Sequence, residues 1–107
     1  MYAVRIKTHF KRSLEKLTKR DEALKNRIES KVRDLSRAPY SESKTLTAGL
    51  KGKRSTYVGR EYRIICSICE ECRQMGYKRF NRCPDCEEIP DKSIILWDVD
   101  KREIVYE

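Results

Sequence analysis

The segment "RSTYVGREYRIICSI", residues 54–68, decides the fold. Its two arms, 54–58 and 61–68, are rich in β-branched and aromatic residues, which favour strands. Gly59 and Arg60 lie between the arms, and a glycine in so short a connection is typical of a tight turn. The segment therefore predicts an antiparallel β-hairpin.

The second arm places an arginine in the middle of a strand. A charged side chain between apolar neighbours is costly unless it has an acidic partner or points into a cleft. Arg63 is therefore either paired with an acid, such as Glu61 or Asp98, or part of a functional site, and the residues alone leave both interpretations open. Strand alternation puts Tyr62, Ile64, Cys66 and Ile68 on one face and Arg63, Ile65 and Ser67 on the other.

The residues before the hairpin predict one strand and two helices. Alternating apolar side chains in residues 2–6 indicate the strand. Thr8 is expected to cap a short helix, and Asp21 a longer one that ends before Pro39. The apolar faces of these helices are formed by Phe10, Leu14 and Leu17 and by Leu24, Ile28, Val32 and Leu35.

The residues after the hairpin complete an α+β pattern. Residues 93–99 ("SIILWDV") predict a further strand, and "EIVY", residues 103–106, is expected to form a last one. The order of elements predicts an N-terminal strand and a helical hairpin packed on a small antiparallel sheet. With 107 residues and no linker or internal repeat, the chain is expected to form one domain, 1–107.

Charge is unevenly distributed along the chain. Residues 1–63 hold 18 Lys and Arg against 7 Asp and Glu, whereas residues 64–107 hold 7 against 10. A cationic front half suits a polyanion such as RNA or the ribosome, or an acidic protein partner. The alternative is that the lysines and arginines form the solvated faces of the two helices.

The first ten residues, "MYAVRIKTHF", contain no continuous apolar block, so neither a signal peptide nor a membrane span is expected. We therefore expect a cytoplasmic protein that has no membrane partner. Thiols stay reduced in that compartment, so its five cysteines are expected to bind metal rather than to form disulfides.

Four of the cysteines have the spacing of a zinc site. Cys69-x2-Cys72 and Cys83-x2-Cys86 form two turns of an inserted hairpin, 69–86, and each turn can offer two thiolates to one tetrahedral zinc ion. Four thiolates leave no open position on the metal, so this zinc would be structural. Its contribution to folding would be on the order of 10 kcal/mol. Disulfides, an iron–sulfur centre and a role for Cys66 as a ligand remain alternatives.

The tip of the predicted hairpin combines basic and aromatic residues. Arg79 and Arg82 lie beside Tyr77 and Phe80. Such a tip could bind nucleic acid by stacking and by charge. A solvated loop around two packed aromatic rings explains the same residues.

The segments "LKGKRSTYVGREYRII" (50–65) and "IILWDVDKREIVYE" (94–107), preceded by a strand and two helices, resemble the RelE/ParE superfamily of toxin–antitoxin systems. The resemblance covers nearly the whole chain apart from residues 69–92. It is most similar to an archaeal RelE-like branch with a cysteine insertion at that point. The resemblance implies a RelE-like fold with a curved antiparallel sheet, and a RelB-like antitoxin as partner.

The resemblance also implies an activity. RelE-type toxins cleave messenger RNA in the ribosomal A site, where a 2′-OH attacks the adjacent phosphate; no small-molecule cofactor is implied. Such chemistry needs a proton acceptor, cations for the developing charge and a donor for the leaving oxygen. The residues that match the family's catalytic positions are Arg63, Arg102 and Tyr106, with Lys53 and Arg54 as a loose match to its basic pair. The residues expected to bind RNA are Lys51, Arg60, Lys101, Arg79 and Arg82.

The sequence departs from the family at two points. Ser55, Thr56 and Tyr57 replace the alternating basic residues of many relatives, and Asp100 and Lys101 replace Gly-His. The only histidine, His9, cannot supply a two-histidine acid/base pair. Two other functions therefore stay open: a non-catalytic toxin fold, either a ParE-like gyrase inhibitor or a decayed toxin, and a small zinc-containing module that binds nucleic acid.

Overall fold

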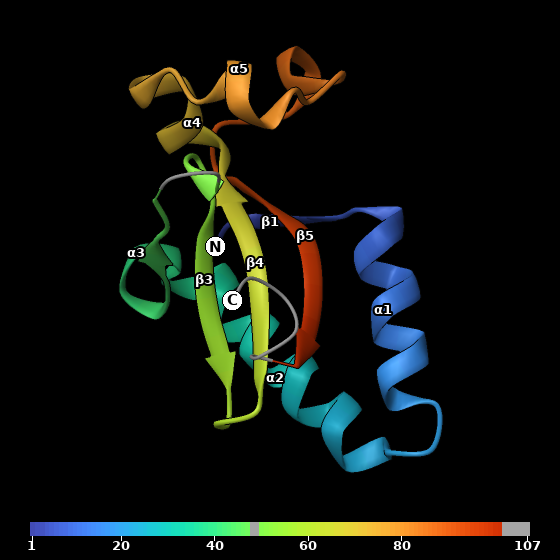
Figure 1. Cartoon of the computed structure of the whole chain (residues 1–107). Helices are drawn as coiled ribbons and strands as arrows, with labels where there is room; N and C mark the ends of the chain where they lie inside the picture. Colours follow the sequence, from blue (N-terminus) through green and yellow to red (C-terminus); the bar gives the residue numbers. More distant parts are fainter. Residues whose placement is uncertain (48–49, 102–107) are drawn as a thin grey trace.

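A five-stranded mixed sheet forms the centre of the computed structural model (Figure 1). Residues 1–47 and 50–101 are described. The strand order is β1-β5-β4-β3-β2, so the last described strand lies inside the sheet. The strands are β1 (Ala3–Ile6), β2 (Lys44–Thr45), β3 (Arg54–Val58), β4 (Tyr62–Ile68) and β5 (Ser93–Lys101). The predicted last strand, 103–106, lies outside the described residues.

The hairpin formed by β3 and β4 confirms the first prediction. Tyr57 lies opposite Arg63, and Val58 lies opposite Tyr62. Gly59 has φ +65°, a conformation that glycine adopts without steric cost.

One strand pairing differs from the prediction of a wholly antiparallel sheet. β1 pairs with β5 in parallel, with Ala3 opposite Ser93 and Ile6 opposite Leu96. The helices return the chain to the starting edge of the sheet, so a strand at each end of the chain can run in the same direction. The other pairings are antiparallel, and the predicted α+β class is confirmed.

Two helices cover one face of this sheet. The first, α1 (Thr8–Thr18), begins one residue after Lys7, so Thr8 is its first residue and not its cap. The second, α2 (Glu22–Arg37), is capped by Asp21 as predicted, since the Asp21 carboxylate accepts a hydrogen bond of 2.9 Å from the backbone N–H of Leu24. A short helix, α3 (Pro39–Glu42), follows it.

The core lies between these helices and the sheet. The helices contribute four buried apolar residues, and the strands contribute the apolar face of β4 that the alternation predicted. This face therefore belongs to the fold, and functional side chains have to be sought on the opposite one. The buried core residues are Phe10, Leu24, Ile28, Leu35, Val58, Ile64, Cys66, Ile68, Ile94, Leu96 and Val99.

A β-bulge interrupts the pairing of β4 with β5. Ile65 lies opposite Asp98, whereas the next residue, Cys66, lies opposite Leu96. Trp97 is therefore the extra residue of the bulge. A bulge turns a side chain away from the regular alternation, which matters for Trp97 below.

The cysteine segment folds as a helical cap over the end of the sheet (Figure 1). We use "cap" for residues 69–88, which comprise α4 (Cys69–Met75), α5 (Lys78–Asn81) and a 3-10 turn, Cys86–Glu88. The prediction of a hairpin with two cysteine turns is thus wrong in its secondary structure, because the first cysteine pair lies in a helix. No helix in the described part of the chain is both long and apolar enough to span a membrane.

Candidate functional site

The face of the sheet opposite the core carries Arg63. We call it the Arg63 face and define it by Tyr57, Arg63, Ser67 and Trp97. Tyr57 and Arg63 lie side by side in the hairpin, and Trp97 donates a hydrogen bond of 2.8 Å from Nε1 to Ser67 Oγ. Three neighbouring strands thus contribute polar or aromatic side chains to one surface.

Arg63 contacts an aromatic residue rather than an acid. Its Nη2 donates to the hydroxyl of Tyr57 over 3.3 Å, and its guanidinium carbon lies 5.4 Å from the centre of the Tyr57 ring. Among the described residues, no ion pair joins it to Glu61 or Asp98, the partners that the sequence suggested. Nε of Arg63 is buried without a hydrogen-bond partner in the same set. An unsatisfied buried N–H is costly, so this atom favours a ligand at the site.

Asp100 and Lys101 follow on the adjacent strand. Asp100 lies opposite Arg63, and Lys101 lies opposite Tyr62. By this register Lys101 follows the core face with Tyr62, and it lines a hollow beside α1, whereas Asp100 lowers the positive charge near Arg63. Arg60 is exposed in the turn of the hairpin. The candidate catalytic residues Arg102 and Tyr106 lie outside the described residues, so their predicted roles stay predictions.

Lys53 lies at the other end of the Arg63 face. Its Nζ donates to Asn81 Oδ1 over 2.9 Å and lies 4.9 Å from the centre of the Trp97 ring. Burial lowers the pKa of Lys53, and the nearby Cys83 opposes this shift. A lysine with a lowered pKa is a reasonable proton acceptor, although Lys53 and Arg63 come from opposite ends of the hairpin.

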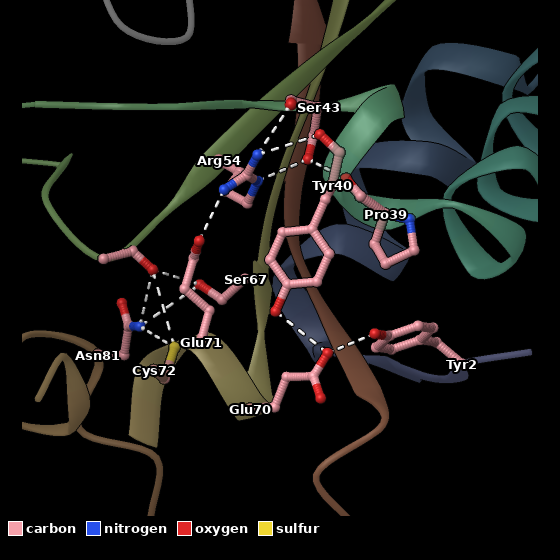
Figure 2. Close-up of polar contacts among 11 residues, drawn as sticks. Tyr2, Pro39, Tyr40, Ser43, Arg54, Ser67, Glu70, Glu71, Cys72 and Asn81 are labelled. Atoms are coloured by element: carbon pink, nitrogen blue, oxygen red, sulfur yellow. Dashed lines mark hydrogen bonds and ion pairs between the residues drawn. The ribbon is translucent and has the colours of Figure 1, made fainter. Parts of the chain in front are cut away.

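Arg54 has a structural role, which the sequence did not show (Figure 2). Its side chain points to the core side of the sheet, where Nε donates to Ser43 Oγ over 2.7 Å and Nη1 donates to Glu71 over 2.8 Å. Nη2 donates to the backbone carbonyls of Tyr40 and Ser43. The residue is only 7% exposed. Its placement therefore does not support the prediction that Arg54 is catalytic, because its donors are already used within the protein.

Glu70, beside Glu71, forms a second link between the cap and the body of the protein. Its Oε1 accepts hydrogen bonds from the hydroxyls of Tyr2 and Tyr40 (Figure 2). The bond to Glu70 raises the pKa of Tyr2, whereas burial is the main cause that raises the pKa of Tyr40. Glu70 and Glu71 of α4 thus link the cap to Tyr2, to α3 and to β3.

The carbonyl of Gly52 joins the cap to the Arg63 face. It accepts hydrogen bonds from Ser67 Oγ at 2.9 Å and from Asn81 Nδ2 at 3.0 Å. The same Asn81 nitrogen lies 3.1 Å from Cys72 Sγ. Gly52 has φ +94°, and a Cβ atom there would lie 3.1 Å from Tyr77 Cβ, so a larger residue would not fit without rearrangement.

The four predicted zinc ligands all lie in the cap. Burial is the main cause that raises the pKa of the Cys69 thiol to about 11, and the other three thiols of the set also raise it. The donor chemistry fits zinc, although no three His, Cys, Asp or Glu side chains among the described residues are arranged to hold a metal ion. Zinc therefore stays a prediction. Cys66 lies apart from the set, fully buried in the main core.

The remaining predicted RNA-binding residues lie near the cap. Lys51 is exposed, with Nζ 5.7 Å from the centre of the Phe80 ring. Arg82 is exposed and has φ 51°. Arg79 belongs to α5. Arg79 and Arg82 belong to the cap and Lys51 contacts it, so the structure separates these positions from Arg60 in the hairpin turn.

Sequence reasoning missed an acid–histidine pair beside the sheet. His9 Nε2 lies 3.2 Å from Asp98 Oδ1, which also accepts a hydrogen bond of 3.0 Å from Ser13. A hollow of about 580 Å³ lies there, lined by the α1 side chains and by the last residues of β5. Asp98 and His9 are 89 positions apart in the chain, and nothing in the sequence pattern indicated that they meet.

Solved structures of toxins share this fold. The chain matches no protein-family model and no curated protein. It is similar to the toxin–antitoxin complex RelBE2 from Mycobacterium tuberculosis, with 29% identity and a TM-score of 0.64 over 94% of this chain and 98% of that chain. It is also similar to a YoeB/ParE toxin from Agrobacterium tumefaciens, with 11% identity and a TM-score of 0.66 over 94% and 98% of the two chains. YafQ from Escherichia coli gives 10% identity and a TM-score of 0.57 over the full length of both chains.

These similarities cover nearly the whole of each chain. They show that this chain has the fold of these small α+β toxins. The chain is thus similar over nearly its whole length to toxins of the RelE/ParE superfamily. The family resemblance of residues 50–65 and 94–107 is thereby confirmed, while the archaeal branch stays a prediction.

Proposed function

We propose that the protein is a RelE-type toxin that cleaves messenger RNA on the ribosome and so inhibits translation in the cytoplasm. The observation that carries this proposal is the position of Arg63. Its side chain lies on the face of the sheet that the helices leave uncovered, with Nε unsatisfied among the described residues and Tyr57 beside it. A guanidinium held in this way is suited to a phosphate, because its donors match two phosphate oxygens.

Arg63 can be assigned to one part of the reaction. The 2′-oxygen of one nucleotide would form a bond to the adjacent phosphorus, while the bond from phosphorus to the 5′-oxygen of the next nucleotide breaks. Arg63 would stabilise the charge that develops on the phosphate oxygens. The proton that the 2′-OH releases and the proton that the 5′-oxygen takes up are assigned to no described residue, because Lys53 lies at the opposite end of the hairpin from Arg63.

An antitoxin is the second proposed partner. RelBE2 and the YoeB–YefM complex from Staphylococcus aureus, two of the similar solved structures, are toxin–antitoxin complexes. The excess of basic residues in residues 1–63 suits an acidic, RelB-like antitoxin, since complementary charge speeds association and favours the correct partner.

Expression in a bacterial host tests this function. We expect wild-type protein to arrest growth and to produce cuts within codons of ribosome-bound messages, detected by primer extension. Arg63→Ala should do neither, although it is expressed at the same level. Growth arrest without cuts would contradict the proposal and favour a gyrase inhibitor of the ParE kind. Absence of arrest would favour a decayed toxin or a nucleic-acid-binding module.

A further inference from the structure

Trp97 lies on the Arg63 face in a position fixed by its neighbours. The bulge of β5 places it there, and its indole N–H donates to Ser67 Oγ over 2.8 Å. Ser67 in turn donates to the carbonyl of Gly52, and Asn81 contacts both of these groups. The ring is only partly buried. The ring packs against the small buried cluster of Cys69, Ile89 and Ile95, and its exposed part is what this packing does not explain.

Two lysines from different elements flank the indole ring. Nζ of Lys7, at the end of β1, lies 5.5 Å from the ring centre, and Nζ of Lys53, just before β3, lies 4.9 Å from it. Asp85 lies 4.0 Å from both Lys7 and Arg5, so these three residues together keep one positive charge. With Lys53, the surroundings of Trp97 carry two positive charges.

A ring with cations around it fits single-stranded nucleic acid. Proteins bind such strands with aromatic rings that stack on bases and with basic side chains that follow the phosphates. A base stacks on an aromatic ring more strongly than an exposed ammonium group does, so a base can displace a lysine from the ring. The displaced lysine then lies next to the phosphate of the same nucleotide, with which its ammonium group can form an ion pair.

We propose that Trp97 is a stacking platform for a base of single-stranded RNA, with Lys7 and Lys53 binding the adjoining phosphates. The proposal rests on the proposed function, because it extends the RNA path along the Arg63 face. Ser67 lies beside Trp97 and is four residues from Arg63 on β4, or about 13 Å at 3.3 Å per residue. The platform therefore binds a nucleotide other than the one that is cleaved.

The protein reports on this site directly, since Trp97 is its only tryptophan. The probe is a 2′-O-methylated hexaadenylate, which cannot be cleaved, and its matched control is an abasic oligomer of the same length. We expect the hexaadenylate to quench the fluorescence of Trp97 and the abasic oligomer to leave it almost unchanged. Equal quenching by both probes would overturn the proposal, because it would show that only phosphates bind.

Variants separate stacking from folding. In binding measured by anisotropy of labelled hexaadenylate, Trp97→Ala should weaken affinity by about 5- to 150-fold, the range for one stacked base. Trp97→Phe loses the bond to Ser67 but keeps an aromatic ring, so its affinity should stay within about threefold of wild type. Lys7→Gln, which leaves Trp97 in place, should weaken the binding of both probes. The slope of the logarithm of the binding constant against the logarithm of the salt concentration should become shallower by about 0.7.

Phe80→Ala is the control for the tip of the cap. Unchanged affinity in this variant supports the platform at Trp97, whereas loss of affinity there but not in Trp97→Ala would overturn it. The two proposals can also fail separately. If the wild-type protein cleaves messages but Trp97→Ala binds RNA as tightly as wild type, only the platform is refuted. Base-dependent quenching of Trp97 without any cleavage on ribosomes would support the platform and refute the proposed function.

Discussion

The guanidinium of Arg54 and the carboxylate of Glu71 lie 2.8 Å apart and join a central hairpin of the sheet to the cap. Their side chains are 8% and 15% exposed. A charge at such a depth is tolerated because it has a partner, and removal of that partner leaves the other charge uncompensated. The pair thus makes the position of the cap dependent on a residue of β3.

We expect Glu71→Gln to lower the free energy of unfolding by about 2–3 kcal/mol, since Arg54 would keep its other hydrogen bonds. Urea denaturation measures this change. The ion pair of Lys31 and Glu42, with side chains 27% and 35% exposed, provides the control. Glu42→Gln should cost at most about 1 kcal/mol. Equal losses in the two variants would show that the Arg54 pair has no special role.

Arg63→Ala should reduce cleavage on ribosomes by about 100-fold or more, the usual effect of losing one group that stabilises a developing charge. Its thermal stability should be unchanged, because none of the ion pairs among the described residues includes Arg63. Arg20→Ala, which removes an exposed arginine between α1 and α2, should keep full activity. Primer extension and a melting curve for each variant check both statements.

Zinc should be present at one ion per chain in protein purified without chelators, as measured by mass spectrometry of the metal. Cys69→Ser and Cys83→Ser should lose the metal and melt at a lower temperature, since a structural zinc stabilises only the folded state. Cys66→Ala should keep the metal, because Cys66 is buried in the main core. Wild-type protein with intact cysteines and no bound metal would refute the zinc site.

Cys66 predicts a specific pH dependence of stability. Burial raises the pKa of its thiol to about 12, above the value near 9 of an exposed thiol. Because the pKa is raised in the folded state, the contribution of this thiol to the free energy of unfolding is fully present below pH 9 and is lost as the pH rises toward 12. The loss should approach about 1.4 kcal/mol per pH unit. Cys66→Ala removes this contribution. The difference in free energy of unfolding between wild type and Cys66→Ala, measured by urea denaturation at each pH, should therefore narrow from pH 9 upward.

The sequence predicted the main elements because their signals are local. The 54–68 hairpin, the cap of α2 at Asp21 and the apolar face of β4 depend on spacing within a few residues. The parallel pairing of β1 with β5 could not be predicted in this way, because it joins residues about 90 positions apart. Long-range pairing is decided by the whole fold rather than by local pattern.

The candidate site was predictable only in part. Arg63 was identified because a charge in an apolar strand is unusual. The structural role of Arg54 was not predictable, because its partners are Ser43, the residue after α3, and Glu71 of the cap, and no spacing rule connects them. The bulge that exposes Trp97 was also not predictable, because its sequence reads as a regular strand.

The place of β5 inside the sheet has a consequence for how the chain folds during synthesis. Among the described strands β1 pairs with β5 alone, and β5 is the last of them to be made. The N-terminal strand and the helices therefore cannot complete their sheet until residues 93–101 have emerged from the ribosome. The Arg63 face is completed at the same late stage, because Trp97 of β5 belongs to it.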